Sequence, residues 1–299
     1  MEQALRNRLT FGPIMFAGVL LLLWLDHAVE VATRPWMLQN FGVNYGVGGV
    51  GIMALLIIIL PLATIEMATL LTAERVRPYR LISTLGSGAL VLHAFLTQFP
   101  WFRPISTSSL AFIIVFVMLF AALRRALKRQ SHDAIVHMAG TLLATMYLGG
   151  LGWFMMALRV KQSDFFEGST AKIIMIILVV KFTDIGAYFG GRAVGTHKLI
   201  FWLSPGKTWE GLAIGVLTAG VVGMACAPFI EGFTWIKGLI FGIIIGGIGQ
   251  LGDLLESLMK RDAEVKDSSR LIPGFGGVLD VIDSPLFVGP FAYLLFSLF

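Results

Sequence analysis

Residues 252–284 read GDLLESLMKRDAEVKDSSRLIPGFGGVLDVIDS, and this stretch decides what the rest of the chain is expected to be. An apolar segment ends at Lys260 and Arg261, a polar and glycine-rich loop follows, and another apolar segment begins near Asp280. Charged groups are costly beside hydrocarbon, so such a cluster in an oily chain is a functional-site hypothesis. Carboxylates bind Mg²⁺, cations bind phosphates, and glycines let the backbone approach a ligand. The stretch therefore predicts metal-assisted chemistry on a phosphate at a membrane surface.

The composition of the whole chain agrees with a membrane location. Hydrophobic residues make up 57% of the 299 residues and charged residues 14%, whereas about a quarter of a soluble domain is charged. A membrane-spanning helix needs about 20 apolar residues, and the chain offers such ranges near 10–25, 47–71, 82–100, 108–123, 137–158, 171–191, 211–230, 236–257 and 282–299. Short alternating segments typical of a β-barrel are not found. We predict an all-α polytopic membrane protein with about nine transmembrane helices.

The domain organisation follows from where the polar motifs fall. We expect a region of N-terminal transmembrane helices at 1–170 and a C-terminal catalytic region at 171–299. The first range is short and follows two arginines, and we expect it to be a retained anchor, because no convincing cleavage site follows it.

The distribution of cations predicts the orientation. Sixteen of the 23 lysines and arginines fall in one set of predicted connections and five in the other. The positive-inside rule then places the N-terminus in the cytoplasm and the C-terminus outside, as in a multi-pass protein of the cell's inner membrane. On this interpretation the net charge of +5 reflects topology. Nucleic acid is not an expected partner, because no basic stripe interleaved with aromatic residues is present.

The polar range 192–210 is a second candidate for phosphate binding. Ser204 precedes a Pro-Gly turn, and a helix is expected to start after Lys207 and Thr208. The lysine, the hydroxyl groups and free backbone N–H groups at a helix start can bind a triphosphate. The alternative is an ordinary helix cap beside a lysine of the positive-inside set.

Three side chains upstream share one helix face. Lys181, Asp184 and Tyr188 are spaced i, i+3 and i+7. The alternative to a site role is a structural Lys–Asp pair that neutralises itself within the membrane. A site role for Asp184 is favoured, because it lies close to the predicted cytoplasmic end of its helix.

Two further helix faces carry the carboxylates of the opening stretch. Asp253, Ser257 and Lys260 are spaced i, i+4 and i+7, and Asp280 and Asp283 are spaced i, i+3. If the two faces meet, three carboxylates surround one cation, and Mg²⁺ is commonly shared between carboxylates and substrate phosphates. Each aspartate alone could be a helix cap or a surface charge. Their concentration at one membrane face favours a site.

Other polar or glycine-rich features carry less weight. GVGGVG at 46–51 fits G-x-G-x-x-G, but no predicted strand precedes it, so a dinucleotide site is not expected. Glu66 and His93 lie within predicted spans, either as a buried polar pair or as part of a lipid-facing cavity. Close helix packing is the expected role of Gly242, Gly246, Gly247, Gly249 and Gly252.

The spacing of these motifs resembles the phosphatidate cytidylyltransferase (CDP-diacylglycerol synthase) family over about residues 181–284. The similar residues run from Ser257-x-x-Lys260-Arg261 through Lys266-Asp267-x-Ser269 and Leu271-Ile272-Pro273-Gly274 to Gly276-Gly277-x-x-Asp280-x-x-Asp283-Ser284. Upstream, Asp184-x-x-Ala187-Tyr188, His197-Lys198 and Ser204-Pro205-x-Lys207-Thr208-Trp209-Glu210-Gly211 also match.

Two positions depart from that signature. Phe275 stands where the family usually has histidine, and Val281 stands where it usually has arginine. Both missing side chains could donate hydrogen bonds to phosphate. A paralogue with an altered lipid preference and a weakened enzyme are the two alternatives that these departures raise.

The resemblance implies transfer of a cytidylyl group from CTP to phosphatidic acid with Mg²⁺, and a second cation stays an alternative. It implies metal binding by Asp253, Asp280, Asp283 and Asp184, catalytic roles for Lys260, Ser257 and Asp283, and substrate binding by Ser204, Lys207, Thr208, Arg261 and Lys266. Membrane lipids and a second copy of the chain, as a homodimer, are the further partners considered.

Two other functions are kept beside this one. The first is a CTP-using kinase or nucleotidyltransferase for another lipid, which product analysis would distinguish. The second is a transporter or a catalytically silent membrane scaffold. Transporters concentrate charges near the bilayer midplane, whereas most charges here fall at the predicted cytoplasmic face.

Overall fold

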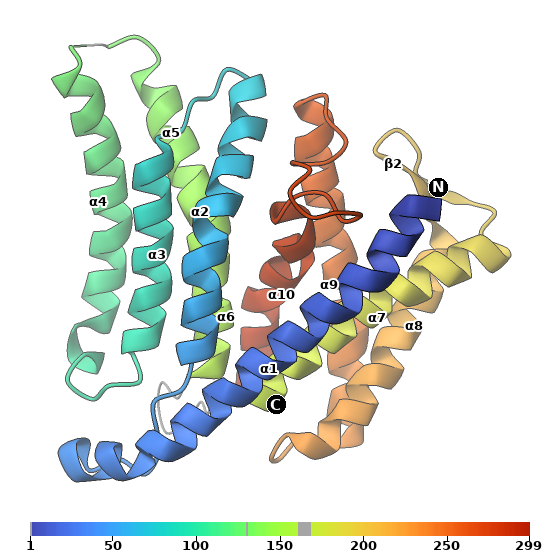
Figure 1. The fold of residues 1–299 in the computed structure, drawn as a ribbon, viewed down its shortest axis with the longest axis horizontal. Helices are drawn as coiled ribbons and strands as arrows, with labels where there is room; N and C mark the ends of the chain where they lie inside the picture. Colours follow the sequence, from blue (N-terminus) through green and yellow to red (C-terminus); the bar gives the residue numbers. More distant parts are fainter. Residues whose placement is uncertain (1, 130, 161–168) are drawn as a thin grey trace. The chain divides into compact units, whose positions relative to one another are not determined.

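The computed structural model describes residues 2–129, 131–160 and 169–299, which fold almost entirely as helices (Figure 1). Within these ranges, eight helices are long and apolar enough to cross a membrane, and a further apolar helix, α3 (Arg80–Leu96), is shorter. Every predicted span overlaps one of these helical segments. The expected all-α polytopic membrane fold is confirmed.

The chain divides into two compact units, of which the first comprises Met1–Gly168 and Ala263–Val281. Its other elements are α1 (Glu2–Phe41), α2 (Val50–Ala73), η1 (Arg103–Ile105), α4 (Ser106–Leu127), α5 (Ala134–Thr145), the π-helical η2 (Met146–Gly150) and α6 (Leu151–Arg159). The loop between α9 and α10 thus folds with the N-terminal helices, whereas the sequence grouped it with the C-terminal region.

Helix α1 is longer than the short anchor expected at 10–25, because Asp26, which follows this range, is buried instead of ending the helix. Asp26 forms an ion pair with Arg159, with 2.5 Å between Oδ2 and Nε and both side chains 0% exposed. Asp26 Oδ1 also accepts a hydrogen bond of 2.9 Å from Gly51 N–H. The glycines at 46–51 pack closely here: a Cβ on Gly48 would lie 2.5 Å from Arg159 Nη1. The run therefore has a packing role, and a helix precedes it where a dinucleotide site needs a strand.

The second unit comprises Ser169–Asp262 and Ile282–Phe299. Its elements are α7 (Thr170–Val194), β1 (Lys198–Ile200), β2 (Ser204–Thr208), α8 (Trp209–Cys226), η3 (Ala227–Phe229), α9 (Trp235–Asp262) and most of α10 (Leu279–Leu298). The two strands form an antiparallel hairpin with Lys198 opposite Thr208. The sequence predicted only a polar loop there.

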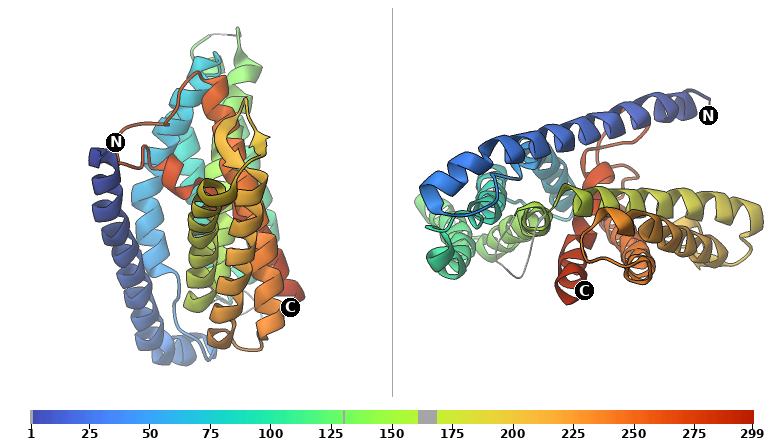
Figure 2. Two further views of the ribbon diagram at one scale, coloured as in Figure 1. Left: turned by 90° about the vertical axis from the view of Figure 1, so that its right-hand side faces the viewer. Right: turned by 90° about the horizontal axis from the view of Figure 1, so that it is seen from below.

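Glycines allow the helices of the second unit to pack closely. Helices α7 and α8 lie side by side in each view (Figures 1 and 2), and a Cβ on Gly215 would lie 2.7 Å from the carbonyl oxygen of Thr183. Between α8 and α9, a Cβ on Gly242 would clash with the carbonyl oxygen of Ala219. Gly246, Gly249 and Gly252 also face neighbouring side chains, which confirms their expected packing role. Gly247 has open space beside it, so the expectation was wrong at that position.

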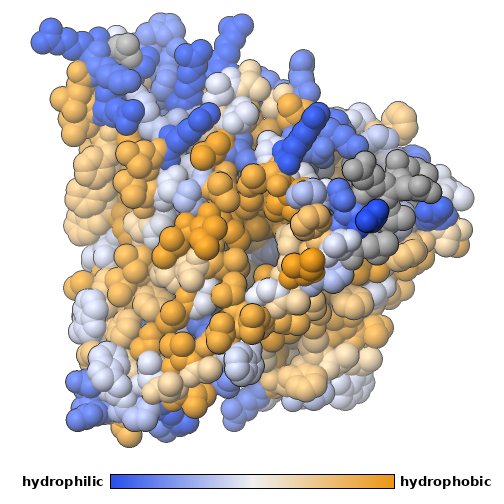
Figure 3. Space-filling model, in the orientation of Figure 1, coloured by the Kyte–Doolittle hydropathy of each residue, from blue (hydrophilic) through white to orange (hydrophobic). Residues whose placement is uncertain are grey.

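The surface of the first unit has the polarity of a membrane protein. In Figure 3, hydrophobic side chains cover the middle of its helices and hydrophilic side chains gather at the two helix ends. Large exposed hydrophobic residues on α4 include Phe112, Phe116 and Phe120. Such residues suit a hydrocarbon environment, in which helices satisfy their own backbone groups.

Candidate active site

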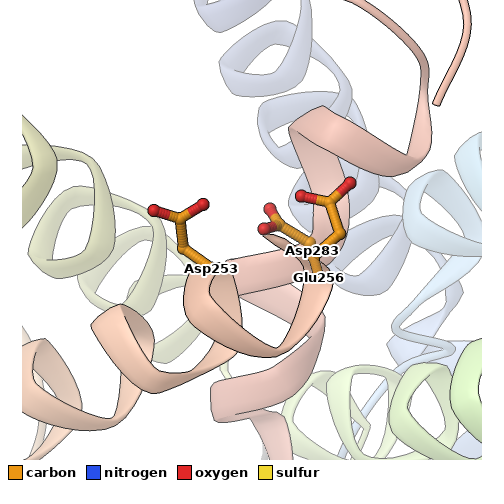
Figure 4. Close-up of side chains that lie close together, drawn as sticks. All are labelled: Asp253, Glu256 and Asp283. Carbon is orange, nitrogen blue, oxygen red and sulfur yellow. The ribbon is translucent and has the colours of Figure 1, made fainter. Parts of the chain in front are cut away.

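Three carboxylates meet within the second unit (Figure 4). Asp253 and Glu256 project from one side of α9, and Asp283 projects from α10. One oxygen from each lies within 4.8 Å of the others. Close packing places the two helices in register: a Cβ on Gly252 would come within 2.9 Å of Phe287 Cβ.

Burial makes this cluster costly unless its charges are compensated. Glu256 is 1% exposed and Asp283 is 4% exposed. Carboxylates whose oxygens lie this close together repel each other when all are ionised, so a shared proton or a bound cation is needed to compensate their charges. Three carboxylates with oxygens this close fit the ligand chemistry of Mg²⁺. The arrangement is therefore suited to holding a divalent cation.

Two lysines flank the carboxylates. Lys207 Nζ lies 2.5 Å from Asp253 Oδ2, and Lys260 Nζ lies 3.0 Å from Glu256 Oε2. The side chain of Lys207 is 20% exposed and that of Lys260 is 13% exposed. Ser257 is half-buried on the same helix, α9. Partly buried ammonium groups beside a carboxylate cluster could neutralise phosphate charge.

Asp184 joins the cluster through an amide. Gln250 Oε1 accepts a hydrogen bond of 2.9 Å from Lys207 Nζ, while Gln250 Nε2 donates one of 2.8 Å to Asp184 Oδ1. Because Gln250 is 4% exposed, this chain of contacts is shielded from water. Asp184 therefore supports the site through Gln250 in this structure, and the predicted Lys181–Asp184–Tyr188 face lies on α7.

The hairpin that carries Lys207 is fixed at its base. Thr208 caps α8, since its Oγ1 accepts a hydrogen bond of 3.1 Å from Gly211 N–H. The carboxylate of Glu210 accepts hydrogen bonds from the backbone N–H groups of Thr196 and His197. The structure thus contains the helix cap that the alternative interpretation predicted, and it also places Lys207 near acidic groups. Ser204 is half-buried at the other end of β2.

The remaining predicted residues have other surroundings. Arg261 Nε donates a hydrogen bond of 3.3 Å to the carbonyl oxygen of Leu203, within the second unit. Lys266 is exposed on the loop of the first unit. Asp280 also belongs to the first unit, where its Oδ2 accepts hydrogen bonds from Gly277 N–H at 2.6 Å and Ser268 N–H at 3.0 Å. Its predicted role as a metal ligand stays a prediction, and these contacts give it a loop-capping role.

The two polar residues that sequence reasoning could not place have separate partners. Glu66 is buried on α2 and accepts hydrogen bonds from the loop before α10, including one of 2.7 Å from Leu279 N–H. His93 Nδ1 accepts one of 3.0 Å from Trp153 Nε1, and its Nε2 lies 2.8 Å from the carbonyl oxygen of Ser106. Each is a buried polar group with its own partners, so the two do not form a pair. Glu66 also lines a cavity of about 410 Å³, together with Leu62, Ile65, Ser269, Arg270 and Leu271.

Comparison with known proteins identifies the family. A profile described as "Cytidylyltransferase family" matches residues 28–299. The chain is 34% identical over 230 residues to a phosphatidate cytidylyltransferase of Bacillus subtilis (strain 168), covering 75% of this chain and 83% of the relative.

Two further relatives match shorter stretches. A phosphatidate cytidylyltransferase of Haemophilus influenzae is 45% identical over 124 residues, covering 40% of this chain and 43% of the relative. An uncharacterized protein of Escherichia coli (strain K12), YnbB, is 33% identical over 151 residues, covering 50% and 49%. These two matches span about half of each relative or less, whereas the family profile spans nearly the whole of this chain. The chain therefore belongs to the cytidylyltransferase family.

Proposed function

We propose that this protein transfers a cytidylyl group from CTP to phosphatidic acid, giving CDP-diacylglycerol and pyrophosphate. One observation carries the proposal: Asp253 and the buried Glu256 and Asp283 form a carboxylate cluster flanked by two lysines, in a chain of the cytidylyltransferase family. The names of its relatives from Bacillus subtilis and Haemophilus influenzae favour phosphatidate as the acceptor.

The reaction needs positioning and charge neutralisation more than a protein nucleophile. A phosphate oxygen of the lipid forms a bond to the α-phosphorus of CTP, and the bond from that phosphorus to the bridging oxygen of pyrophosphate breaks. Pyrophosphate leaves with the electron pair. Negative charge accumulates on the oxygens around the phosphorus, so preorganised cations lower the barrier.

The residues of the second unit divide this work. Lys207 and Lys260 neutralise phosphate charge, and Ser257 donates a hydrogen bond to a phosphate oxygen. Asp253, Glu256 and Asp283 would hold Mg²⁺, which supplies Lewis-acid stabilisation of phosphate oxygens when bound. Asp184 orients Lys207 through Gln250, whose amide contacts both side chains.

The remaining residues keep the roles that the resemblance to the family implies. Ser204 and Thr208 belong to the hairpin that carries Lys207, and we assign them to CTP. Arg261 and Lys266 supply further positive charge for phosphate groups. Asp280 is retained as a candidate metal ligand.

The membrane orientation is part of the proposal. The cation bias supports a cytoplasmic N-terminus in the cell's inner membrane, where CTP is available on the same side as the site. A reporter fused after Phe299 should report the outer side, and a cytoplasmic signal there would contradict the orientation. A homodimer would appear as twice the mass of the 32.6 kDa chain when the detergent-solubilised protein is weighed by light scattering.

Product analysis tests the reaction itself. Purified protein is incubated with phosphatidic acid, Mg²⁺ and CTP labelled at the α-phosphorus. We expect label in a CDP-lipid and release of pyrophosphate. Formation of CDP with a phosphorylated lipid would identify a kinase instead, and no turnover on any lipid phosphate would favour a silent scaffold.

A further inference from the structure

We propose that Glu66 of α2 is a positioning residue, which sets the conformation of the glycine-rich loop at 267–279 and thereby the start of α10. This inference deepens the proposed function and rests on it only for its effect on turnover. The loop's conformation can be measured without any assay of activity.

The contacts of Glu66 all reach the loop within the first unit. Oε1 accepts hydrogen bonds from Ser269 Oγ at 2.6 Å and from Val278 N–H at 3.0 Å. Oε2 accepts hydrogen bonds from Leu279 N–H at 2.7 Å and from Ser268 Oγ at 3.2 Å. Glu66 itself is 5% exposed. A single buried side chain from α2 therefore holds both ends of the loop.

Part of this arrangement is a helix cap supplied from a distant segment. The N–H groups of Val278 and Leu279 lie at the start of α10, where backbone donors lack partners within the helix. A carboxylate at this end satisfies the donors and interacts favourably with the helix dipole. The start of α10 is thus defined by a residue that lies more than 200 positions earlier in the sequence.

Asp280 completes the arrangement from inside the loop. Ser268 Oγ lies 3.0 Å from Asp280 Oδ2 and 3.2 Å from Glu66 Oε2, so the hydroxyl group lies between the two carboxylates. Asp280 Oδ2 also accepts from Gly277 N–H. The two acids together therefore bind the backbone and the serine of the same loop.

This packing explains the glycine pair of the loop. Gly276 has a φ of +103°, a conformation that L side chains rarely adopt. A Cβ on Gly277 would lie 2.6 Å from Glu66 Oε2 and would clash with Ser268 Oγ. The backbone can approach Glu66 this closely only because no side chain intervenes. The glycine pair and Glu66 are parts of one structural element.

A carboxylate suits these donors better than any isostere. Four donors converge on two oxygens, and glutamine offers only one oxygen as an acceptor. Its NH₂ group would face the N–H of either Val278 or Leu279, and neither can accept. Glu66→Gln therefore keeps the shape of the side chain but replaces one of the two acceptor oxygens with a donor group, which removes one of the backbone contacts that hold the loop.

The experiment measures loop order directly. Cys226 is the only cysteine, so a Cys226→Ala background with Leu271→Cys carries one nitroxide, at an exposed position of the loop. In full-length protein in detergent, we expect Glu66→Gln to increase nitroxide mobility clearly. Glu74→Gln, which removes a carboxylate from the exposed end of the same helix, should leave mobility as in the background. Unchanged mobility in Glu66→Gln would overturn the proposal.

Turnover supplies the second measurement. We expect Glu66→Gln to lower kcat at least tenfold with a smaller change in KM for CTP, because the carboxylate is not placed against substrate. Glu66→Asp, which keeps two acceptors, should recover part of both kcat and loop order. A change confined to KM for CTP would contradict a positioning role. Equal losses of kcat in Glu66→Gln and Glu66→Asp, without a change in nitroxide mobility, would also contradict it.

A third variant protects the test against misfolding. If Glu66→Gln fails to accumulate in the membrane, Ser269→Ala removes one donor and leaves three, and we expect a smaller increase in mobility. Native-like mobility in that variant would overturn the proposal. If the unmodified chain has no turnover, the proposed function fails while the mobility measurement still decides the role of Glu66.

Discussion

The ammonium nitrogen of Lys207 lies 2.5 Å from the carboxylate of Asp253, which joins the β-hairpin to α9. The hairpin thus places the ammonium group of Lys207 beside a carboxylate that also belongs to the cluster. In the proposed reaction each partner would have a second role, Asp253 as a metal ligand and Lys207 as a phosphate ligand. Their pairing keeps both side chains in place and compensates their charges before substrate arrives.

Asp253→Asn tests the metal role of this pair. The substitution keeps the shape of the side chain and removes its charge, so we expect kcat to fall more than about tenfold, equivalent to about 1.4 kcal/mol in the barrier. The Mg²⁺ concentration for half-maximal rate should rise. Asp262→Asn, at the exposed end of the same helix, is the matched control. If both variants and the native protein need the same Mg²⁺ concentration for half-maximal rate, Asp253 is not a metal ligand.

The buried pair of Glu256 and Lys260 makes a prediction about stability. Removing one partner of a buried pair leaves an uncompensated charge and typically costs about 3–5 kcal/mol. We expect Lys260→Met to lower the thermal midpoint in detergent by several degrees. The double variant Glu256→Gln with Lys260→Met should recover most of the midpoint, because neither charge remains.

Activity should not follow stability in this series. Both Lys260→Met and the double variant should be inactive, since the first loses a proposed phosphate ligand and the second also loses a carboxylate of the cluster. Recovery of turnover together with the midpoint would show that the pair is only structural.

The sequence predicted the elements of the site better than their partners. Apolar ranges predicted the helices, because span length and hydropathy are local properties of a chain. Helical spacing also placed Asp253 and Ser257 correctly on one helix. The predicted third carboxylate was Asp280, whereas the structure places Glu256 beside Asp253 and Asp283.

The missed residues share a physical cause. Glu256 and Gln250 lie on α9 near Asp253, but spacing alone cannot say which neighbouring polar side chain will be buried. Glu66 contacts residues more than 200 positions away, so no local pattern could assign it. Its isolation as an acid within an apolar span was the available signal, because such a residue requires a partner.

Two glycines of α9 give a matched test of helix packing. A Cβ on Gly242 would clash with the carbonyl oxygen of Ala219 on α8, whereas Gly247 has open space. We expect Gly242→Ala to destabilise the protein by about 1–3 kcal/mol through overpacking. Gly247→Ala should be neutral or stabilising by up to about 1 kcal/mol, since alanine favours helix. Similar thermal midpoints for the two variants would contradict the packing assigned to α8 and α9.

Phe275 and Val281 are the two positions that depart from the family signature. The ring of Phe275 packs against α1: a Cβ added to Gly12 would lie 3.3 Å from the Cζ of Phe275. The side chain therefore contributes packing where histidine would offer a hydrogen bond. One charged hydrogen bond made only in the transition state is worth about 1.5–3 kcal/mol, or roughly ten- to hundredfold in rate.

We expect Phe275→His with Val281→Arg to raise turnover of phosphatidic acid by about tenfold or more. Phe275→Leu with Val281→Leu changes the same positions without adding donors and serves as the matched control. The measurement is kcat/KM for each variant with phosphatidic acid and with a polyprenyl phosphate. One outcome would contradict a weakened enzyme: the native protein is faster on the polyprenyl phosphate, and the double variant gains nothing on phosphatidic acid. Phe275 and Val281 would then be adaptations to another acceptor, because a weakened site would gain activity when the hydrogen-bond donors are restored.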